Sequence, residues 1–292
     1  MRKMSLISAI LVALPFYAKA WESCGTDWKG RTANCEYQID DDGTLTIRGV
    51  GDNGNIGRWE KDSSRFTPKL APWYGENVTN IVIDESIKDL GYEGLWGMTS
   101  QKPIVIPSSV TIIGEDAFQN VTAPEVIIPN SVTEIVKWSF SQSQIDKINI
   151  PDSVTSIGDY AFYQAKGLSD IVIPDSVISI GSKAFEECTD LKSIVIGDGV
   201  TSILGKAFAD TPAYIYCQDT QERSCKDLIG ENNQEALGKL RLYTIENGKI
   251  KVGSKTYDSF DELPQYKLRR IYTIDEANAV AGEKNRVSIR YR

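Results

Sequence analysis

Residues 150–185 read IPDSVTSIGDYAFYQAKGLSDIVIPDSVISIGSKAF, and this stretch contains the same motif twice. The motif IPDSV-x-SIG-x-x-AF begins at Ile150 and again at Ile173, and its copies end at Phe162 and Phe185. A unit of about two dozen residues that recurs in this way is typical of solenoids, in which similar supersecondary units stack on one another.

The repeat extends well beyond these two copies. The second apolar residue of the I-x-I-P element recurs in steps of 23, 22, 22, 23 and 23 residues, at Ile83, Ile106, Ile128, Ile150, Ile173 and Ile196. Phenylalanine recurs at matching steps, at Phe118, Phe140, Phe162, Phe185 and Phe208. These intervals exclude chance similarity and predict a solenoid of six coils over residues 80–212, the last of them irregular.

The residues of one coil predict its local structure. In I-V-I-P, period-two alternation turns the outer residues inward and the middle one outward, and proline ends the strand. Asp or Asn followed by Ser forms a corner through bonds to nearby backbone. Gly114, Gly158 and Gly181 stand where a Cβ would obstruct the turn, and Ala-Phe begins a short helical turn.

The unit I-x-I-P-x-S-V-x-x-I-G-x-x-A-F resembles the BspA-like leucine-rich repeat family of bacterial surface proteins. The resemblance implies a β-rich, right-handed leucine-rich repeat solenoid with a parallel sheet along one side. It also implies a secreted or surface protein that engages other proteins or host surfaces without a shared catalytic motif. Val136-Lys137-Trp138-Ser139 and Leu204-Gly205 depart from the pattern and put the local regularity of their coils in doubt.

The ends of the chain predict export and capping. Residues 1–20 form a signal peptide, with a basic head, an apolar run and a small-x-small cleavage site; its removal takes the formal net charge from −8 to −11. So acidic a chain is a poor nucleic-acid binder, and no later apolar stretch is long enough to span a bilayer. The expected location is extracellular, cell-surface or periplasmic.

Residues 21–79 are predicted to cap the first coil, because an open solenoid end exposes apolar core. Trp28, Trp59 and Trp73 of this cap are interpreted as core residues, with carbohydrate binding as the alternative. Residues 213–239 are predicted to cap the last coil with a loop and a helix.

Residues 240–292 are assigned to a small basic α+β module. It contains a hairpin around Asn247-Gly248 and a helix that starts in the capping box of Thr273 and Glu276. Its last strand turns three arginines to one face, either as a solvated surface or as a docking element for an acidic partner: Arg286, Arg290 and Arg292.

Five cysteines in an oxidising compartment suggest two local disulfides, Cys24–Cys35 and Cys217–Cys225, although spacing alone does not fix the connectivity. Cys188 is left over inside a repeat; a buried, inert thiol is favoured over a reactive surface thiol.

Histidine is absent, which excludes Ser-His-Asp and Cys-His nucleophile pairs and His-ligated zinc. Asp40-Asp41-Asp42 is interpreted as a hairpin corner rather than a calcium or acid–base site. No catalytic residue, metal or cofactor is predicted.

The most promising candidate site is the row of outward residues in the middle of the strands. At ~4.8 Å per strand they would line up over roughly 24 Å. Five of the six are apolar, which reflects either β-propensity or a binding stripe for a ligand or a second copy. They are Val82, Val105, Ile127, Asn149, Val172 and Val195.

These patterns favour a secreted or surface recognition protein that binds a protein or extracellular-matrix partner through the solenoid face. The alternative is a structural or self-assembling envelope component docked by the basic C-terminal module. A carbohydrate-active enzyme that uses only carboxylates is the least favoured hypothesis. The sequence does not name the partner, because solenoid faces vary while the scaffold persists.

Overall fold

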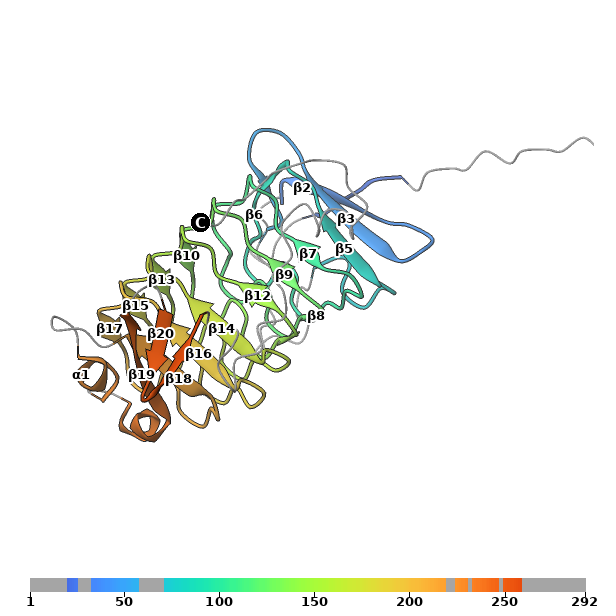
Figure 1. Ribbon diagram of the computed structural model, residues 1–292. Helices are drawn as coiled ribbons and strands as arrows, with labels where there is room; N and C mark the ends of the chain where they lie inside the picture. The colour runs from blue at the N-terminus through green and yellow to red at the C-terminus, as the bar shows by residue number, and fades with distance from the viewer. Residues whose placement is uncertain are drawn as a thin grey trace, which may run out of the picture.

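The computed structural model describes residues 20–25, 33–57, 71–218, 224–230, 233–246 and 249–258. Within them the chain forms a solenoid of stacked coils whose short strands are mostly parallel (Figure 1). The predicted signal peptide lies outside the described residues except for Ala20. Trp28, Trp59 and all residues after Asp258, including the predicted helix and the three arginines, also lie outside them.

The first ladder of strands carries the I-x-I elements, and its neighbours pair in parallel within β7–β9–β12 and within β14–β16–β18. Equivalent residues are in register, for example Ile171 with Ile194. The repeated isoleucines at the strand ends are buried, so the stacking that the repeat predicts is confirmed. The strands are β5 (Asn80–Ile83), β7 (Ile104–Val105), β9 (Val126–Ile127), β12 (Ile148–Asn149), β14 (Asp170–Ile173), β16 (Ser193–Ile196) and β18 (Tyr214–Gln218).

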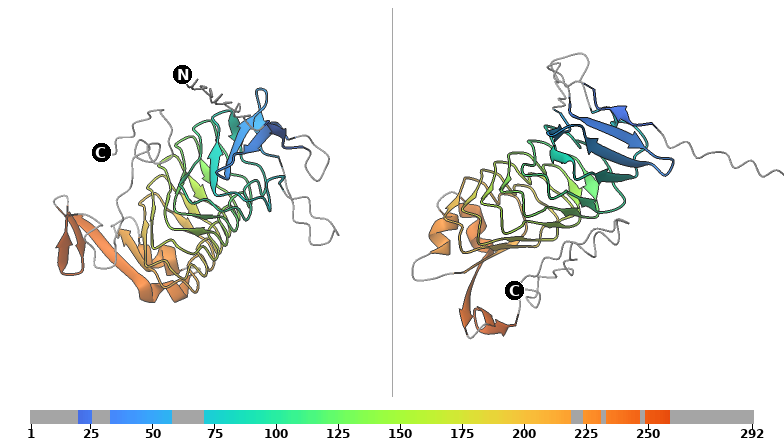
Figure 2. Two further views of the ribbon diagram at one scale, coloured as in Figure 1. Left: turned by 90° about the vertical axis from the view of Figure 1, so that its right-hand side faces the viewer. Right: turned by 90° about the horizontal axis from the view of Figure 1, so that it is seen from above.

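Two further ladders close each coil. The second consists of β10 (Glu134–Ile135), β13 (Ser156–Ile157), β15 (Ser179–Ile180) and β17 (Ser202–Ile203). Near the N-terminal end this second ladder is extended by the pair β4 (Gly54–Asn55) and β6 (Ile87–Asp89), through the bridges of Asp89 with Ile112 and of Ile113 with Ile135. The third ladder pairs β8 (Thr122–Ala123) with β11 (Gln144–Ile145). The coils therefore stack on one another with their short strands in parallel ladders, as the stacked coils of Figure 2 show.

A column of phenylalanine rings fills the centre of the solenoid. Successive rings are stacked with centroids 5.0, 5.3, 5.1 and 6.0 Å apart. All five are buried, and they are Phe118, Phe140, Phe162, Phe185 and Phe208. One ring cannot bury both of its faces within its own coil, so the column ties the stability of each coil to that of its neighbours.

The segment around each Ala-Phe pair forms turns that bond to the next coil instead of a helix. Ala117 donates its backbone N–H to Gly114 in its own coil, whereas Phe118 donates to Ser139 in the next one. A helix is interrupted because non-glycine residues four apart take a positive φ: Asp116 and Asn120, Trp138 and Gln142, Tyr160 and Gln164, Lys183 and Glu187, Lys206 and Asp210.

The serine of the corner also bonds between coils. Ser153 donates its hydroxyl to the Val132 carbonyl at 2.6 Å, and Ser176 donates to Val154 at 2.7 Å. Glycine is required at the turn because neighbouring coils approach closely there. A Cβ on Gly181 would lie 2.4 Å from the backbone nitrogen of Asp159 in the preceding coil. Both residue types therefore serve the close approach of neighbouring coils.

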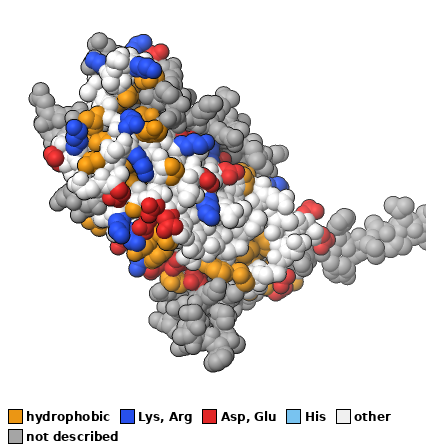
Figure 3. Space-filling model, turned by 90° about the horizontal axis from the view of Figure 1, so that it is seen from below, with side chains coloured by type: hydrophobic (Ala, Val, Ile, Leu, Met, Phe, Trp, Pro, Cys, Tyr) orange, Lys and Arg blue, Asp and Glu red, His pale blue; other side chains and the backbone are white. Residues whose placement is uncertain are grey.

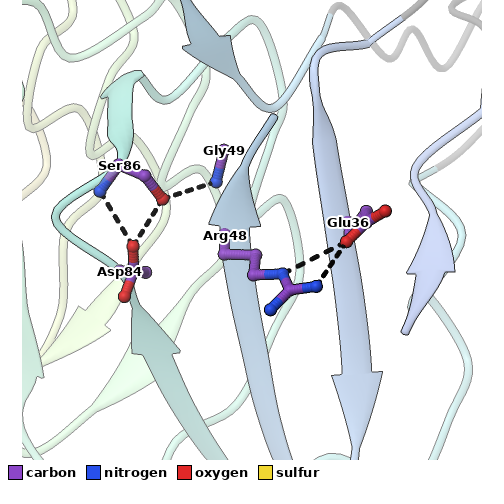
Figure 4. Close-up of polar contacts among 5 residues, drawn as sticks. All are labelled: Glu36, Arg48, Gly49, Asp84 and Ser86. Atoms are coloured by element: carbon purple, nitrogen blue, oxygen red, sulfur yellow. Dashed lines mark hydrogen bonds and ion pairs between the residues drawn. The ribbon is translucent and has the colours of Figure 1, made fainter. Parts of the chain in front are cut away.

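The N-terminal cap extends the first ladder. In the sheet β1 (Glu22–Ser23), β2 (Cys35–Ile39), β3 (Thr44–Gly49) and β5, the pair β3–β5 is parallel and the others are antiparallel. Arg48 donates to Glu36 across β2–β3 at 2.8 Å (Figure 4). Trp73 is fully buried and donates to Gly94, which confirms its prediction as a core residue.

The cap is joined to the first coil by polar contacts. The Gly49 N–H donates to Ser86 Oγ at 2.8 Å, and the Ser86 N–H donates to Asp84 at 2.9 Å (Figure 4). Within the cap, Asp40 accepts the Thr44 N–H at 2.7 Å, so the DDG segment is the predicted hairpin corner.

The C-terminal end continues the solenoid sheet. After β18 come α1 (Cys225–Gly230) and the 3-10 helix η1 (Gln234–Lys239), as expected for a cap. β19 (Leu240–Glu246) then pairs with β18 in parallel, although the sequence pattern predicts a separate module from residue 240 onward. Its second half forms the predicted hairpin with β20 (Lys249–Val252), followed by β21 (Lys255–Tyr257). Figure 2 shows this hairpin standing out from the solenoid.

Candidate binding surface on the strand face

The outward row of the first ladder forms the surface that the sequence singled out. In-register pairing aligns Val105, Ile127 and Asn149 along β7, β9 and β12. These residues and Val82 are partly exposed, and Val172 is 36% exposed. The row continues into the N-terminal cap, where Val82 pairs with Thr46. We call the set Val82, Val105, Ile127, Asn149 and Val172 the stripe.

Val195 faces away from the main core, as predicted, but it is buried, so its prediction as part of the exposed stripe is wrong. It is only 3% exposed, because Tyr216, Tyr243 and Ile250 pack over it. This second hydrophobic cluster exists because β19 leaves the sheet after pairing with β18 and folds back with β20. The hairpin therefore closes the C-terminal end of the stripe.

A polar rim runs beside the stripe, two residues before its members on several strands. Glu125 and Lys147 form an ion pair at 2.9 Å between neighbouring strands. Asp170 accepts the hydroxyl protons of Ser169, at 2.6 Å, and of Ser193. These polar groups are satisfied within the protein, so they shape the edge of the stripe at little desolvation cost to a partner.

Basic side chains gather at the C-terminal end of the solenoid, with hydrophobic side chains between them (Figure 3). The hairpin carries Lys249, Lys251 and Lys255, and the Arg241 guanidinium lies 4.2 Å from the centre of the Tyr214 ring. The predicted docking residues Arg286, Arg290 and Arg292 lie outside the described residues and remain predictions.

The cysteines contribute stability rather than reactive chemistry. Disulfides join Cys24 to Cys35 and Cys217 to Cys225, the pairs expected from the sequence. Cys188 is free and buried, and its thiol contacts the Phe162 carbonyl at 2.9 Å. Burial raises the pKa of Cys188 to about 12, so the nucleophilic thiolate is not formed at neutral pH.

Two kinds of group bear on possible chemistry in the described part of the chain, namely clustered metal ligands and carboxyl groups with an altered pKa. It contains no group of three or more Cys, Asp or Glu residues arranged to hold a metal ion. Asp116 has the most altered carboxyl group: burial raises its pKa to about 6, while the hydrogen bond from Tyr92 and the charge of Lys137 act in the opposite direction.

Sequence reasoning missed a cluster of aromatic side chains on another side of the solenoid. Trp138 stacks on Tyr160 with ring centroids 4.0 Å apart, and Tyr163 meets both rings edge-on. Trp138 and Tyr160 occupy the same position in adjacent coils. That register was available from the repeat spacing, but Trp138 was interpreted only as a departure from the consensus.

No helix in the described part of the chain is long and apolar enough to cross a bilayer.

The stacked parallel ladders, the isoleucine rungs and the phenylalanine column together define a leucine-rich repeat solenoid. Residues 93–214 match the family described as BspA type leucine rich repeat region, in six copies. The resemblance that the repeat motif indicates is therefore confirmed over these residues.

Similar solved structures are leucine-rich repeat and surface proteins of bacteria. The pneumococcal vaccine antigen PcpA is 16% identical with a TM-score of 0.38; the alignment covers 75% of this chain and 52% of PcpA, so the chain spans about half the length of that protein. A leucine-rich cell surface protein from Faecalibacterium prausnitzii is 21% identical (TM-score 0.35; 63% and 69% covered). The leucine-rich repeat protein of T. pallidum is 18% identical (TM-score 0.36; 71% and 95% covered). No curated protein matches the sequence.

Proposed function

We propose that this protein is an exported, non-enzymatic recognition protein that binds a protein partner through the stripe. The observation that carries the proposal is the row of partly exposed, mostly aliphatic side chains from Val82 to Val172, which is in register across β7, β9 and β12. A row of aliphatic side chains with a self-satisfied polar rim has the composition of a protein–protein interface. The rigid coils hold this row in one geometry, so binding costs little conformational entropy.

The experiment compares two triple variants in capture assays. Val105→Glu, Ile127→Glu and Val172→Glu together place three charges on the stripe without touching the buried core. The matched control is Ile112→Glu, Ile178→Glu and Leu204→Glu, because these side chains are also exposed, by 55%, 55% and 45%, but lie next to the second ladder.

Each protein is used to capture partners from host-matrix extracts and from extracts of the producing cell's own envelope, and the bound proteins are identified by mass spectrometry. We expect a partner that the wild type and the control retain and the stripe variant loses, while thermal unfolding of all three stays similar. Equal capture by the stripe variant would exclude this face as the binding surface.

Export is part of the same proposal and has its own test. The predicted signal peptide ends at Ala20, so N-terminal sequencing of the protein recovered outside the cytoplasm should begin at Trp21. Recovery of the intact N-terminus from the cytoplasm would contradict export.

A second function, docking to the cell envelope through the basic C-terminal region, is supported by the lysines of the hairpin. The informative variant ends after Asp258 and carries Lys249→Gln, Lys251→Gln and Lys255→Gln, because removal of β19 itself would expose Val195 and Tyr216. Loss of the truncated protein from the cell fraction would support docking, and unchanged retention would refute it. The described hairpin stays in place in both outcomes.

A further inference from the structure

The turns between the second and third ladders carry aromatic side chains at their first left-handed position in only two adjacent coils. That position is occupied by Glu93, Asp116, Trp138, Tyr160, Lys183 and Lys206 along the solenoid. The two aromatic rings stack at 4.0 Å with an interplanar angle of 11°, and Tyr163 adds a third ring at 5.7 Å from Trp138 and 5.6 Å from Tyr160. All three side chains are partly exposed.

The scaffold does not explain these rings. Trp138 and Tyr160 hold positive φ angles of 62° and 57°, a backbone region that bulky residues rarely adopt. The equivalent position in the other coils holds a charged residue, so the turn forms without an aromatic side chain. Bulky residues kept in an unfavourable conformation at the surface are common at binding sites.

Planar polar side chains border the rings in a fixed orientation. Gln142 donates to Gln164 at 3.2 Å, and Gln164 donates to Glu187 at 2.7 Å, so the three form a chain across neighbouring coils. The Tyr163 hydroxyl lies 3.5 Å from the other carboxylate oxygen of Glu187. Each amide group has a second N–H, and each carboxylate oxygen has a further lone pair, so this row can bond a ligand without breaking its own contacts.

We propose that Trp138, Tyr160 and Tyr163, with Gln142, Gln164 and Glu187, form a binding site for a neutral saccharide. A pyranose ring has an apolar C–H face that packs on an aromatic ring, and its hydroxyl groups pair with planar amide and carboxylate groups. This site combines both features within adjacent coils.

The charges near the rings select against acidic sugars. Lys183 lies 5.5 Å from the centre of the Tyr160 ring and is paired with Glu186 at 2.9 Å, so these two charges offset each other and Glu187 leaves a net negative charge beside the rings. Uronic or sialic acid groups would be repelled there, so we expect neutral hexose oligosaccharides to bind more tightly than their acidic counterparts.

The test uses the whole exported chain on an array of neutral and acidic oligosaccharides, followed by calorimetric titration of the best neutral binder. Trp138→Asn combined with Tyr160→Asn removes both rings, and asparagine tolerates the left-handed backbone of this position. We expect at least a tenfold loss of affinity with an unchanged unfolding temperature. The variant Glu187→Ala addresses the polar row separately and should also weaken binding by several-fold.

The stripe variant Val105→Glu, Ile127→Glu and Val172→Glu serves as the control and should bind the saccharide like the wild type. This separates the saccharide site from protein capture, so either can fail without the other. The proposal would be overturned if no neutral saccharide bound, or if acidic saccharides bound more tightly. It would also be overturned if both site variants bound the saccharide as tightly as the wild type does. If the double variant unfolds, Glu187→Ala alone decides it.

Discussion

Replacement of Phe162 by alanine tests whether the coils depend on one another through the central column. The Phe162 ring is fully buried and lies 5.3 Å from Phe140 and 5.1 Å from Phe185, nearly parallel to both. Truncation of a buried phenylalanine to alanine costs about 3–5 kcal/mol through lost transfer energy and the remaining cavity. A typical domain is stable by only about 5–15 kcal/mol, so this single change removes a large share of the total.

Phe208 provides the internal comparison, because it ends the column. Its ring stacks on Phe185 at 6.0 Å and is almost as buried as that of Phe162. An aromatic pair contributes about 0.5–1.5 kcal/mol beyond area burial, so Phe208→Ala should cost about 1 kcal/mol less than Phe162→Ala. Both values come from urea unfolding followed by circular dichroism, with disulfides intact.

The shape of the transition is a second readout. In a stack of repeats, loss of a central contact weakens the coupling between the two halves, whereas loss of a terminal contact frays one end. Phe162→Ala should therefore lower the denaturant dependence of unfolding or produce two phases. A cost for Phe162→Ala that is no larger than that for Phe208→Ala would refute nearest-neighbour coupling through the rings.

Two further predictions concern polar groups. Burial raises the pKa of Asp116 to about 6 from 3.8, so its ionisation should reduce the free energy of unfolding as the pH rises from about 4 to about 6, by at most about 3 kcal/mol. Asp116→Asn should remove this loss and exceed the wild type in stability at pH 7; urea unfolding of both proteins at several pH values checks this, and identical pH profiles would contradict it. Ser153→Ala removes a hydrogen bond to the Val132 carbonyl of the preceding coil and should cost about 1 kcal/mol in the same assay, whereas unchanged stability would show that the bond is replaced by water.

The periodic part of the fold could be predicted because each coil repeats the same environment. Burial of the isoleucines and phenylalanines follows from alternation and spacing, and Trp73 and the Asp40 corner follow from local chemistry. The direction of the Ser153 bond was not predictable, because the nearest carbonyl belongs to the preceding coil rather than to its own corner. Residue types alone do not show how closely two coils approach.

The burial of Val195 depends on contacts with residues that are distant in the sequence. Its strand environment matches that of Val172 in sequence and register, yet one is buried and the other exposed. The difference arises some fifty residues later in the chain, where β19 joins β18 and the hairpin folds back so that Tyr243 and Ile250 reach Val195. No periodic pattern contains that information.

Both proposed surfaces consist of outward side chains that the packing of the coils does not require. Inward positions repeat because the core of every coil must match the next, so they carry no information about a partner. Function is therefore sought at outward positions whose side chains carry an energetic cost. Trp138 and Tyr160 depart from the repeat and hold a left-handed backbone conformation, and the aliphatic row that ends at the hairpin exposes apolar surface to water. Because they lie on different sides of stiff coils, a protein partner and a saccharide could occupy the same molecule without competing for the same residues.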